Sequence, residues 1–125
     1  MKILSNLKLM RKEWYSAFYS LDTHQLDYLE TDWFFSTNGS KLIHKPHQLR
    51  KLNVLKNSNP LAYSQIRREE KELEVRELGN IASVSGVAIL TDSQGVRTIN
   101  FIECWIKIND AWKLQFQTFE EELCD

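Results

Sequence analysis

The segment 101–105, Phe-Ile-Glu-Cys-Trp, places one carboxylate, that of Glu103, inside an apolar and aromatic stretch. The composition predicts a strand, and side chains alternate between the two faces of a strand. Glu103 then shares its face with two aromatic residues and a lysine, Phe101, Trp105 and Lys107. Such a mixed face is typical of a pocket wall and equally of a partly exposed interface. Glu103 is therefore either a functional carboxylate in a pocket or an outward-facing residue beside Lys107.

Four further polar side chains are candidates to join Glu103. Tyr15 and Tyr19 lie four residues apart, so both hydroxyls could reach a cavity from one helix face, although such tyrosines commonly pack with their hydroxyls in water. Gln117 alternates with apolar residues near the end of the chain and would orient a polar ligand, or contact solvent or a second subunit. Asp32, directly before Trp33, supplies either a second carboxylate or a solvated strand start.

Metal and nucleic-acid chemistry are not indicated by the sequence. His44 and His47 fall on either side of Pro46, one at a strand end and one in a helix, and the two cysteines form no close-spaced motif. The formal net charge is -1 and the basic residues are spread along the chain, so no concentrated basic face is available for a phosphate backbone. We expect no metal, no cofactor and no nucleic-acid partner.

The start of the chain lacks the features of a secretory or membrane-bound protein. Asn6, Lys8 and the run Arg11-Lys12-Glu13 interrupt the apolar residues before a signal-peptide core could form. No stretch approaches the length needed to span a bilayer. We therefore predict a cytoplasmic protein with reduced thiols and no membrane partner.

Three helices are predicted in the first half of the chain. Apolar residues at three- and four-residue steps or their multiples predict a helix running to about residue 21, with the stripe Leu4, Leu7, Trp14, Phe18 and Leu21. Asp22 and Gln25 form a capping box that starts a second helix over about residues 23–30. Pro46 suits the first position of a third helix, which the run 57–60 ends.

Turn signals divide the rest of the chain into strands. The aromatic run 32–35 and the Asn38-Gly39 pair predict a hairpin whose short second strand ends at Ile43. Over residues 63–78 the signals conflict: the run 67–72 has high helix propensity, whereas Leu73 and Val75 alternate with charges. We predict a strand over this segment, whose charged face, including Arg68 and Glu70, is solvated. Turns at 79–80, 92–95 and 109–110 separate strands over 81–90, 96–108 and 112–119.

This order predicts the fold class. Helices gathered early and strands gathered late indicate an α+β fold with the helices packed on one face of a curved antiparallel sheet. The succession is two helices, two strands, one helix and four strands. A length of 125 residues and a hydrophobic fraction of 42% suit one domain, over residues 1–125, with one core.

Four stretches together resemble a known superfamily: 14–17 through Asp22, the run 29–35, the run 79–82, and 105–107 through 112–114. In their order and spacing they resemble the nuclear transport factor 2-like superfamily, particularly its SnoaL-like and ketosteroid-isomerase-like branches, over nearly the whole chain. The resemblance implies a cone-shaped sheet, mixed at most at one edge, wrapped around about three helices. It also implies a mostly apolar pocket for a small hydrophobic ligand and a homodimer formed through the sheet.

The isomerase-like branch uses a carboxylate base, a tyrosine and a protonated acid. The resemblance places Glu103 at the position of the acid. The base position falls at about Ser36 or Thr37, which do not titrate usefully near neutrality, and the tyrosine position falls at Trp14, with Tyr15 about 100° further around the helix. Steroid-isomerase chemistry is therefore not expected.

Two classes of function remain open. The first is a small-molecule pocket with Glu103 and Asp32 as its carboxylates, either a binding site or an acid-base enzyme of isomerase, dehydratase or cyclase type. The residues expected to line it are Trp14, Tyr15, Tyr19, Trp33, Phe35, Phe101, Trp105 and Gln117. The second is a non-catalytic dimeric module whose cone is filled by side chains such as Trp33, Phe35 and Trp105. The first class requires Glu103 to be buried beside aromatic walls.

Overall fold

The computed structural model describes residues 6–122 of the 125-residue chain. Three helices and six strands occupy this part, in the order α1 (Leu7–Tyr19), α2 (Thr23–Leu29), β1 (Glu30–Thr37), β2 (Leu42–His44), α3 (Lys45–Ser58), β3 (Arg67–Leu78), β4 (Ile81–Asp92), β5 (Gly95–Ile108) and β6 (Ala111–Glu121). This order confirms the predicted α+β class and the predicted succession of elements. Leu4 of the predicted helical stripe and Cys124 lie outside the described residues.

Local signals set the helix boundaries. The Asn6 side chain caps α1 by accepting a hydrogen bond from the Leu9 amide at 3.2 Å, and Asp22 caps α2 by accepting one from the Gln25 amide at 3.1 Å. Between the two helices Leu21 has a φ of 58°, and its side chain is fully buried. The chain therefore turns sharply between α1 and α2 while it keeps an apolar residue in the core.

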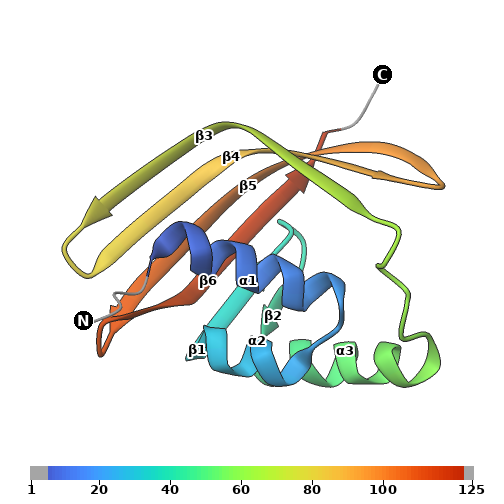
Figure 1. Ribbon diagram of the computed structural model, residues 1–125, viewed down its shortest axis with the longest axis horizontal. Helices are drawn as coiled ribbons and strands as arrows, with labels where there is room; N and C mark the ends of the chain where they lie inside the picture. Colours follow the sequence, from blue (N-terminus) through green and yellow to red (C-terminus); the bar gives the residue numbers. More distant parts are fainter. Residues whose placement is uncertain (1–5, 123–125) are drawn as a thin grey trace.

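All six strands belong to one sheet, in the order β2-β1-β6-β5-β4-β3. The pairing of β1 with β6 is parallel, and the other four pairings are antiparallel. The short β1–β2 hairpin thus joins one side of a long meander from β3 to β6. Figure 1 shows the three helices on one side of this curved sheet, with α1 lying under the strands β3 to β5.

Of the predicted strand 63–78, residues 67–78 form β3, whereas residues 63–65 belong to a turn before it. Its pairing with β4 shifts register between Lys71 and Glu74, and Glu72 has a φ of 57°. Gly86 lies opposite this irregularity, where an added Cβ would come within 2.8 Å of the Leu73 Cδ2 atom and 3.2 Å of the Lys71 carbonyl oxygen. Bulges bend a strand. The absence of a side chain at residue 86 therefore allows β3 to bend closely over β4.

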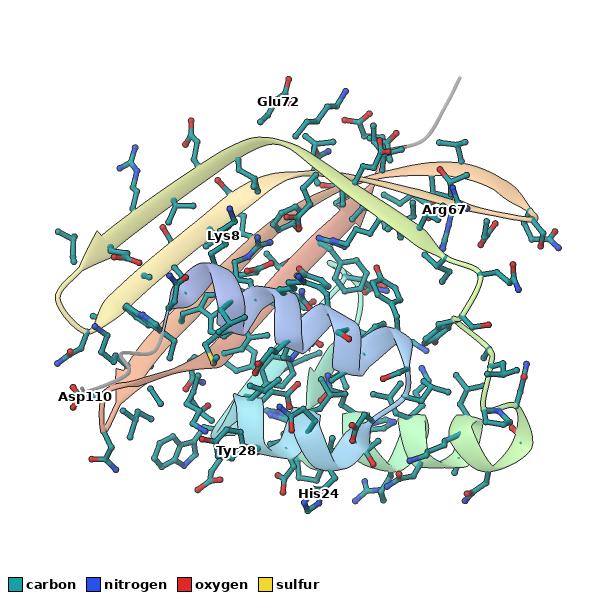
Figure 2. The ribbon with its side chains drawn as sticks, in the orientation of Figure 1. Lys8, His24, Tyr28, Arg67, Glu72 and Asp110 are labelled. Carbon is teal, nitrogen blue, oxygen red and sulfur yellow. The ribbon has the colours of Figure 1, made fainter. Side chains whose placement is uncertain are left out.

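The core lies between the helices and the concave face of the sheet. Its largest fully buried apolar side chains come from the α1–α2 region and from three strands, namely Leu21, Leu26, Leu29, Phe34, Trp105 and Leu114. Figure 2 shows Glu72 pointing away on the outer side of β3, while Lys8 lies between α1 and the sheet. Within residues 6–122, no helix combines the length and the apolar composition needed to cross a membrane.

Candidate functional site

Glu103 lies on β5, faces the helices and is completely buried. Its carboxylate accepts four hydrogen bonds. Arg11 donates two of them, from Nε to Oε1 at 2.7 Å and from Nη2 to Oε2 at 2.9 Å. Trp105 Nε1 donates to Oε1 at 2.9 Å, and the Tyr15 hydroxyl donates to Oε2. The alternative in which Glu103 points outward beside Lys107 is wrong, because β5 turns its Phe101–Glu103–Trp105 face to the core.

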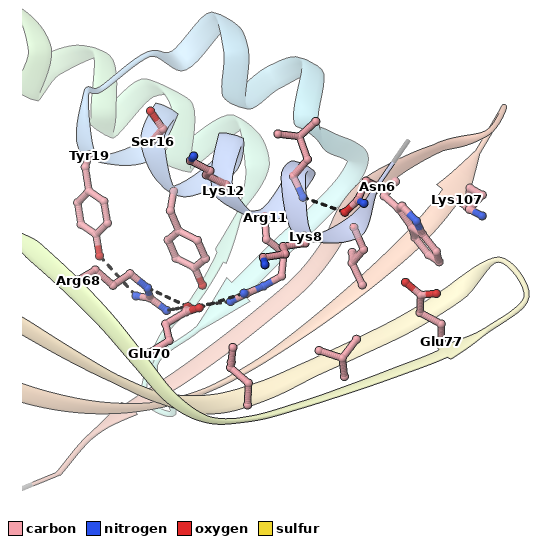
Figure 3. Close-up of a pocket in the computed structure, with 16 residues that line it drawn as sticks. Asn6, Lys8, Arg11, Lys12, Ser16, Tyr19, Arg68, Glu70, Glu77 and Lys107 are labelled. Carbon is pink, nitrogen blue, oxygen red and sulfur yellow. Dashed lines mark hydrogen bonds and ion pairs between the residues drawn. The ribbon is translucent and has the colours of Figure 1, made fainter. Parts of the chain in front are cut away.

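Arg11 also joins α1 to the edge strand β3. Its Nη1 and Nη2 atoms donate to the Glu70 carboxylate at 3.0 and 2.8 Å. Arg68 donates to the same carboxylate at 3.1 and 2.9 Å and lies over the Tyr15 ring, 3.9 Å from its centroid. Figure 3 shows this chain of ion pairs between α1 and β3. The prediction that Arg68 and Glu70 are solvated is therefore wrong, because both lie on the concave side of β3, opposite the buried Leu90 and Ala88.

We call this cluster the Arg11 network; it consists of Arg11, Arg68, Glu70 and Glu103. Its opposite charges stabilise one another. Burial alone would lower the pKa of Arg11, but its hydrogen bonds to Glu103 and Glu70 hold that pKa above its ordinary value. Burial would raise the pKa of Glu70, but hydrogen bonds from Arg11 and the charge of Arg68 lower it. The two arginines and Glu70 therefore stay charged near neutrality.

Tyr15 is the neutral member of the site. Its burial, followed by the charge of Glu103, raises the pKa of Tyr15 well above its ordinary value. Gln117 Nε2 donates to the Tyr15 hydroxyl oxygen at 3.0 Å, and this hydroxyl donates to Glu103. Tyr15 therefore keeps its proton and holds the same carboxylate oxygen, Oε2, to which Arg11 Nη2 donates.

A groove of about 1100 Å³ opens between α1 and β3, and three members of the Arg11 network, Arg11, Arg68 and Glu70, form one part of its wall, whereas Glu103 lies behind them and does not line it. The apolar part comes from α1, β3 and β6, and consists of Leu7, Leu9, Leu73, Val75 and Trp112. Leu9, Leu73 and Val75 have exposed fractions of 48%, 44% and 54%, which are high for residues of their type. The groove therefore presents both apolar side chains and charges to the surroundings.

The predicted site residues separate into two groups. Around Glu103 the structure gathers Tyr15, Tyr19, Phe101, Trp105 and Gln117, of which Tyr15 and Tyr19 line the groove. Of the four others, Trp14 borders this group: its ring packs edge-on against Tyr15 with centroids 4.9 Å apart, while its Nε1 donates to Glu30 at 3.0 Å. Phe35 packs on Phe116 with their ring centroids 4.8 Å apart. Asp32 and Trp33 are exposed, Trp33 by 74%, at a register shift between Glu30 and Phe35.

Sequence reasoning missed Arg11, although a signal was present. Arg11 lies four residues after Leu7 and three before Trp14, so it occupies the buried stripe of α1 rather than its solvated face. A charged residue at such a position requires a partner, because an unpaired buried charge is unfavourable. Glu103 and Glu70 supply that partner from strands that are distant in sequence.

A second buried carboxylate, Glu30, lies at the start of β1. Trp14 Nε1 donates to its Oε2, whereas its Oε1 and the Gln48 Oε1 have no hydrogen-bond partner among the described residues. Burial raises the pKa of Glu30 to about 7, although Trp14, Gln48 and the charge of Lys45 act against this rise. Within residues 6–122, no group of three or more possible metal ligands comes together.

No protein-family model and no curated protein matches this sequence. Solved structures do match. A nuclear transport factor 2-like protein of unknown function in nutrient uptake from Rhodospirillum rubrum is 16% identical, covering 95% of this chain and 100% of its own, with a TM-score of 0.74. A proposed dehydratase of the nuclear transport factor 2-like family from Streptomyces avermitilis is 16% identical, covering 94% of both chains, with a TM-score of 0.75.

A proposed ketosteroid isomerase from Shewanella frigidimarina also matches. It is 12% identical, covering 88% of this chain and 90% of its own, with a TM-score of 0.71. Identities this low establish a shared architecture and no shared chemistry, because one fold carries many functions.

Proposed function

Starting from its nuclear transport factor 2-like fold, we propose that this chain is a homodimeric binding protein that holds a small organic molecule in the groove between α1 and β3. The observation that carries this proposal is the exposed apolar wall of the groove, formed by Leu9, Leu73 and Val75. Covering such side chains with a ligand is favourable by roughly 25 cal/mol for each Å² of apolar surface buried. Concave apolar surfaces with a few placed polar groups are the usual form of ligand sites.

The state of Glu103 favours binding over acid-base chemistry. An ionised carboxylate offers about four lone-pair sites. Four donors from Arg11, Tyr15 and Trp105 already occupy the carboxylate of Glu103. A general base must reach the proton that it abstracts. Glu103 would first have to give up one of these bonds, so we assign it to holding α1, β5 and β3 together beside the groove.

The uncharged fluorophore phenylnaphthylamine tests binding to the groove, because it brightens on entering an apolar site. We expect it to bind the wild-type protein. The double variant Leu73→Gln/Val75→Gln removes two apolar side chains from the groove and should weaken this binding at least fivefold, because about 1 kcal/mol or more of apolar contact is lost. Fluorescence titration gives both affinities.

The matched control is Val54→Gln/Leu61→Gln, which makes the same two changes at exposed positions away from the groove. It should bind the fluorophore as the wild type does. Equal losses in both double variants, or no binding to the wild type, would rule out the groove as a site for apolar molecules.

The outer face of the sheet supports the dimer. Leu78, Ile81 and Ile106 form a cross-strand row on β3, β4 and β5, and Leu78 and Ile81 have exposed fractions of 81% and 64%. Ile102, a further apolar residue on the same face of β5, is 48% exposed. Contiguous apolar patches on a protein surface mark interaction sites, and a self-complementary face yields a twofold dimer.

Light scattering coupled to gel filtration tests this interface. We expect the wild type to show twice the chain mass and Ile81→Lys/Ile102→Lys to show the mass of one chain. The two lysines on each subunit would repel those of the other subunit, and burying their charges in the interface is unfavourable. The control Val54→Lys/Leu61→Lys adds the same charge on α3 and in the following loop and should remain dimeric. A monomeric wild type would contradict the dimer without affecting the groove.

A further inference from the structure

The groove between α1 and β3 carries mainly positive charges. Seven charged side chains line it: the cationic Lys8, Arg11, Lys12, Arg68 and Lys107, and the anionic Glu70 and Glu77. The whole chain has a formal net charge of -1. The excess of positive charge is therefore a property of this groove and does not reflect the general composition.

The charges separate into an inner compensated group and an outer cationic group. In the Arg11 network, two arginines are paired with the carboxylates of Glu70 and Glu103, so the network has no net charge. The outer group consists of Lys8, Lys12 and Lys107 with Glu77 as the anion. Within residues 6–122, no carboxylate lies within ion-pair distance of Lys8 or Lys12. The positive charge of the outer group is thus available to a ligand.

The beginning of α1 strengthens this field. Lys8 lies in the first turn of the helix, which contains no acidic residue. The amino end of a helix carries a partial positive charge and is normally complemented by acids. Lys8 and Arg11 lie three residues apart and so share one face of α1, which Figure 3 shows turned toward the strands. A lysine in this place adds to the positive potential of the groove instead of neutralising it.

An apolar surface adjoins the outer lysines. Leu73 and Val75 project from β3 into the groove, and the Lys107 ammonium lies 4.8 Å from the centroid of the Trp112 ring. A molecule that satisfies both surfaces needs an anionic head and an apolar body. On the basis of the binding function proposed above, we infer that the ligand is an amphipathic organic acid, whose oxyanion is attracted by the outer lysines and whose body lies on Leu73 and Val75.

Two fluorophores with the same aromatic body test this inference. Anilinonaphthalene sulfonate differs from phenylnaphthylamine by its added sulfonate group. In the double variant Lys8→Gln/Lys107→Gln, we expect the affinity for the sulfonate to fall about tenfold and the affinity for phenylnaphthylamine to change less than about twofold. Only the sulfonate carries a charge that the two lysines attract. Raising NaCl from about 50 to about 500 mM should weaken wild-type binding of the sulfonate alone, since salt screens exposed charges.

The matched control is Lys51→Gln/Lys56→Gln, which removes two exposed lysines from α3 and leaves the groove unchanged. It should bind both fluorophores as the wild type does, and circular dichroism should show the same fold in all variants. If phenylnaphthylamine binds but the sulfonate shows no dependence on Lys8 and Lys107, the ligand class is wrong while the binding site stands. If neither fluorophore binds the wild type, both proposals fail.

Discussion

Replacing Glu103 by glutamine should lower the free energy of unfolding by about 3–5 kcal/mol, the cost of leaving one partner of a buried ion pair without the other. Glu103 is completely buried, and Arg11, its main partner, is 8% exposed. The amide that replaces the carboxylate offers one acceptor oxygen where four donors now converge. Urea unfolding at a fixed protein concentration measures the loss.

Two comparisons separate this effect from a general loss of charge. Glu69→Gln makes the same change at an exposed position of β3 and should alter the stability by no more than about 0.5 kcal/mol. In the double variant Glu103→Gln/Arg11→Met, the two losses of unfolding free energy should not add, because each change alone already breaks the same ion pair. We expect the loss in the double variant to differ from the sum of the two single losses by about 1–3 kcal/mol. A Glu103→Gln protein as stable as the wild type would show that the carboxylate is not held structurally and would reopen its assignment as a catalytic acid.

Replacing Glu30 by glutamine should stabilise the protein at about pH 8 and have little effect at about pH 5. The pKa of Glu30 is about 7 in the folded protein, against an ordinary value of 4.5 for this side chain. The folded state therefore favours the protonated acid. The stability that the protonated Glu30 side chain contributes is fully present below pH 4.5, declines as the pH rises toward 7, and is lost above pH 7. This difference in pKa corresponds to about 3 kcal/mol.

Geometry explains why an amide fits this position. The Glu30 Oε2 accepts from Trp14, while the Glu30 Oε1 and the Gln48 Oε1 are acceptors without a described donor. A glutamine at residue 30 keeps an acceptor oxygen for Trp14 and carries no charge at any pH in this range. We therefore expect the substitution to raise the free energy of unfolding by about 2–3 kcal/mol at about pH 8.

The difference between wild type and variant is the quantity to measure, because other groups titrate equally in both proteins. Thermal unfolding followed from about pH 5 to about pH 8 should show a difference that grows through neutrality. Glu69→Gln, at an exposed site, should show no such growth. A stability difference for Glu30→Gln that is constant over this range would mean that Glu30 is already ionised in the folded protein at low pH.

Much of the fold could be predicted from local signals. The Asp22 cap, the Asn38-Gly39 turn and the turns of the late meander each depend on residues adjacent in sequence, and the structure has them where they were expected. The strand β3 was harder to predict, because Arg67 to Glu72 favours a helix by propensity. Pairing with β4 along its length outweighs that propensity, as tertiary context commonly does.

The candidate site was only partly predictable for a physical reason. Aromatic neighbours single out Glu103, and the buried stripe of α1 indicates that Arg11 needs a partner, but neither local sequence shows that these two residues, 92 apart, pair with each other. Arg68 and Glu70 have the spacing of an ordinary charged strand face, and only the bend of β3 over α1 turns them inward. Asp32 and Trp33 were expected at the site but lie outside it. The register shift after Glu30 ends the simple alternation of strand faces on which that expectation depended.

The claim that the groove is the ligand site is tested most directly by a crystal structure of the wild-type protein with phenylnaphthylamine bound. The fluorophore should lie between α1 and β3 in contact with Leu73 and Val75, while the hydrogen bonds from Arg11 and Tyr15 to Glu103 remain intact. A fluorophore found on the outer face of the sheet, or one that displaces Arg11 or Tyr15 from Glu103, would contradict the account.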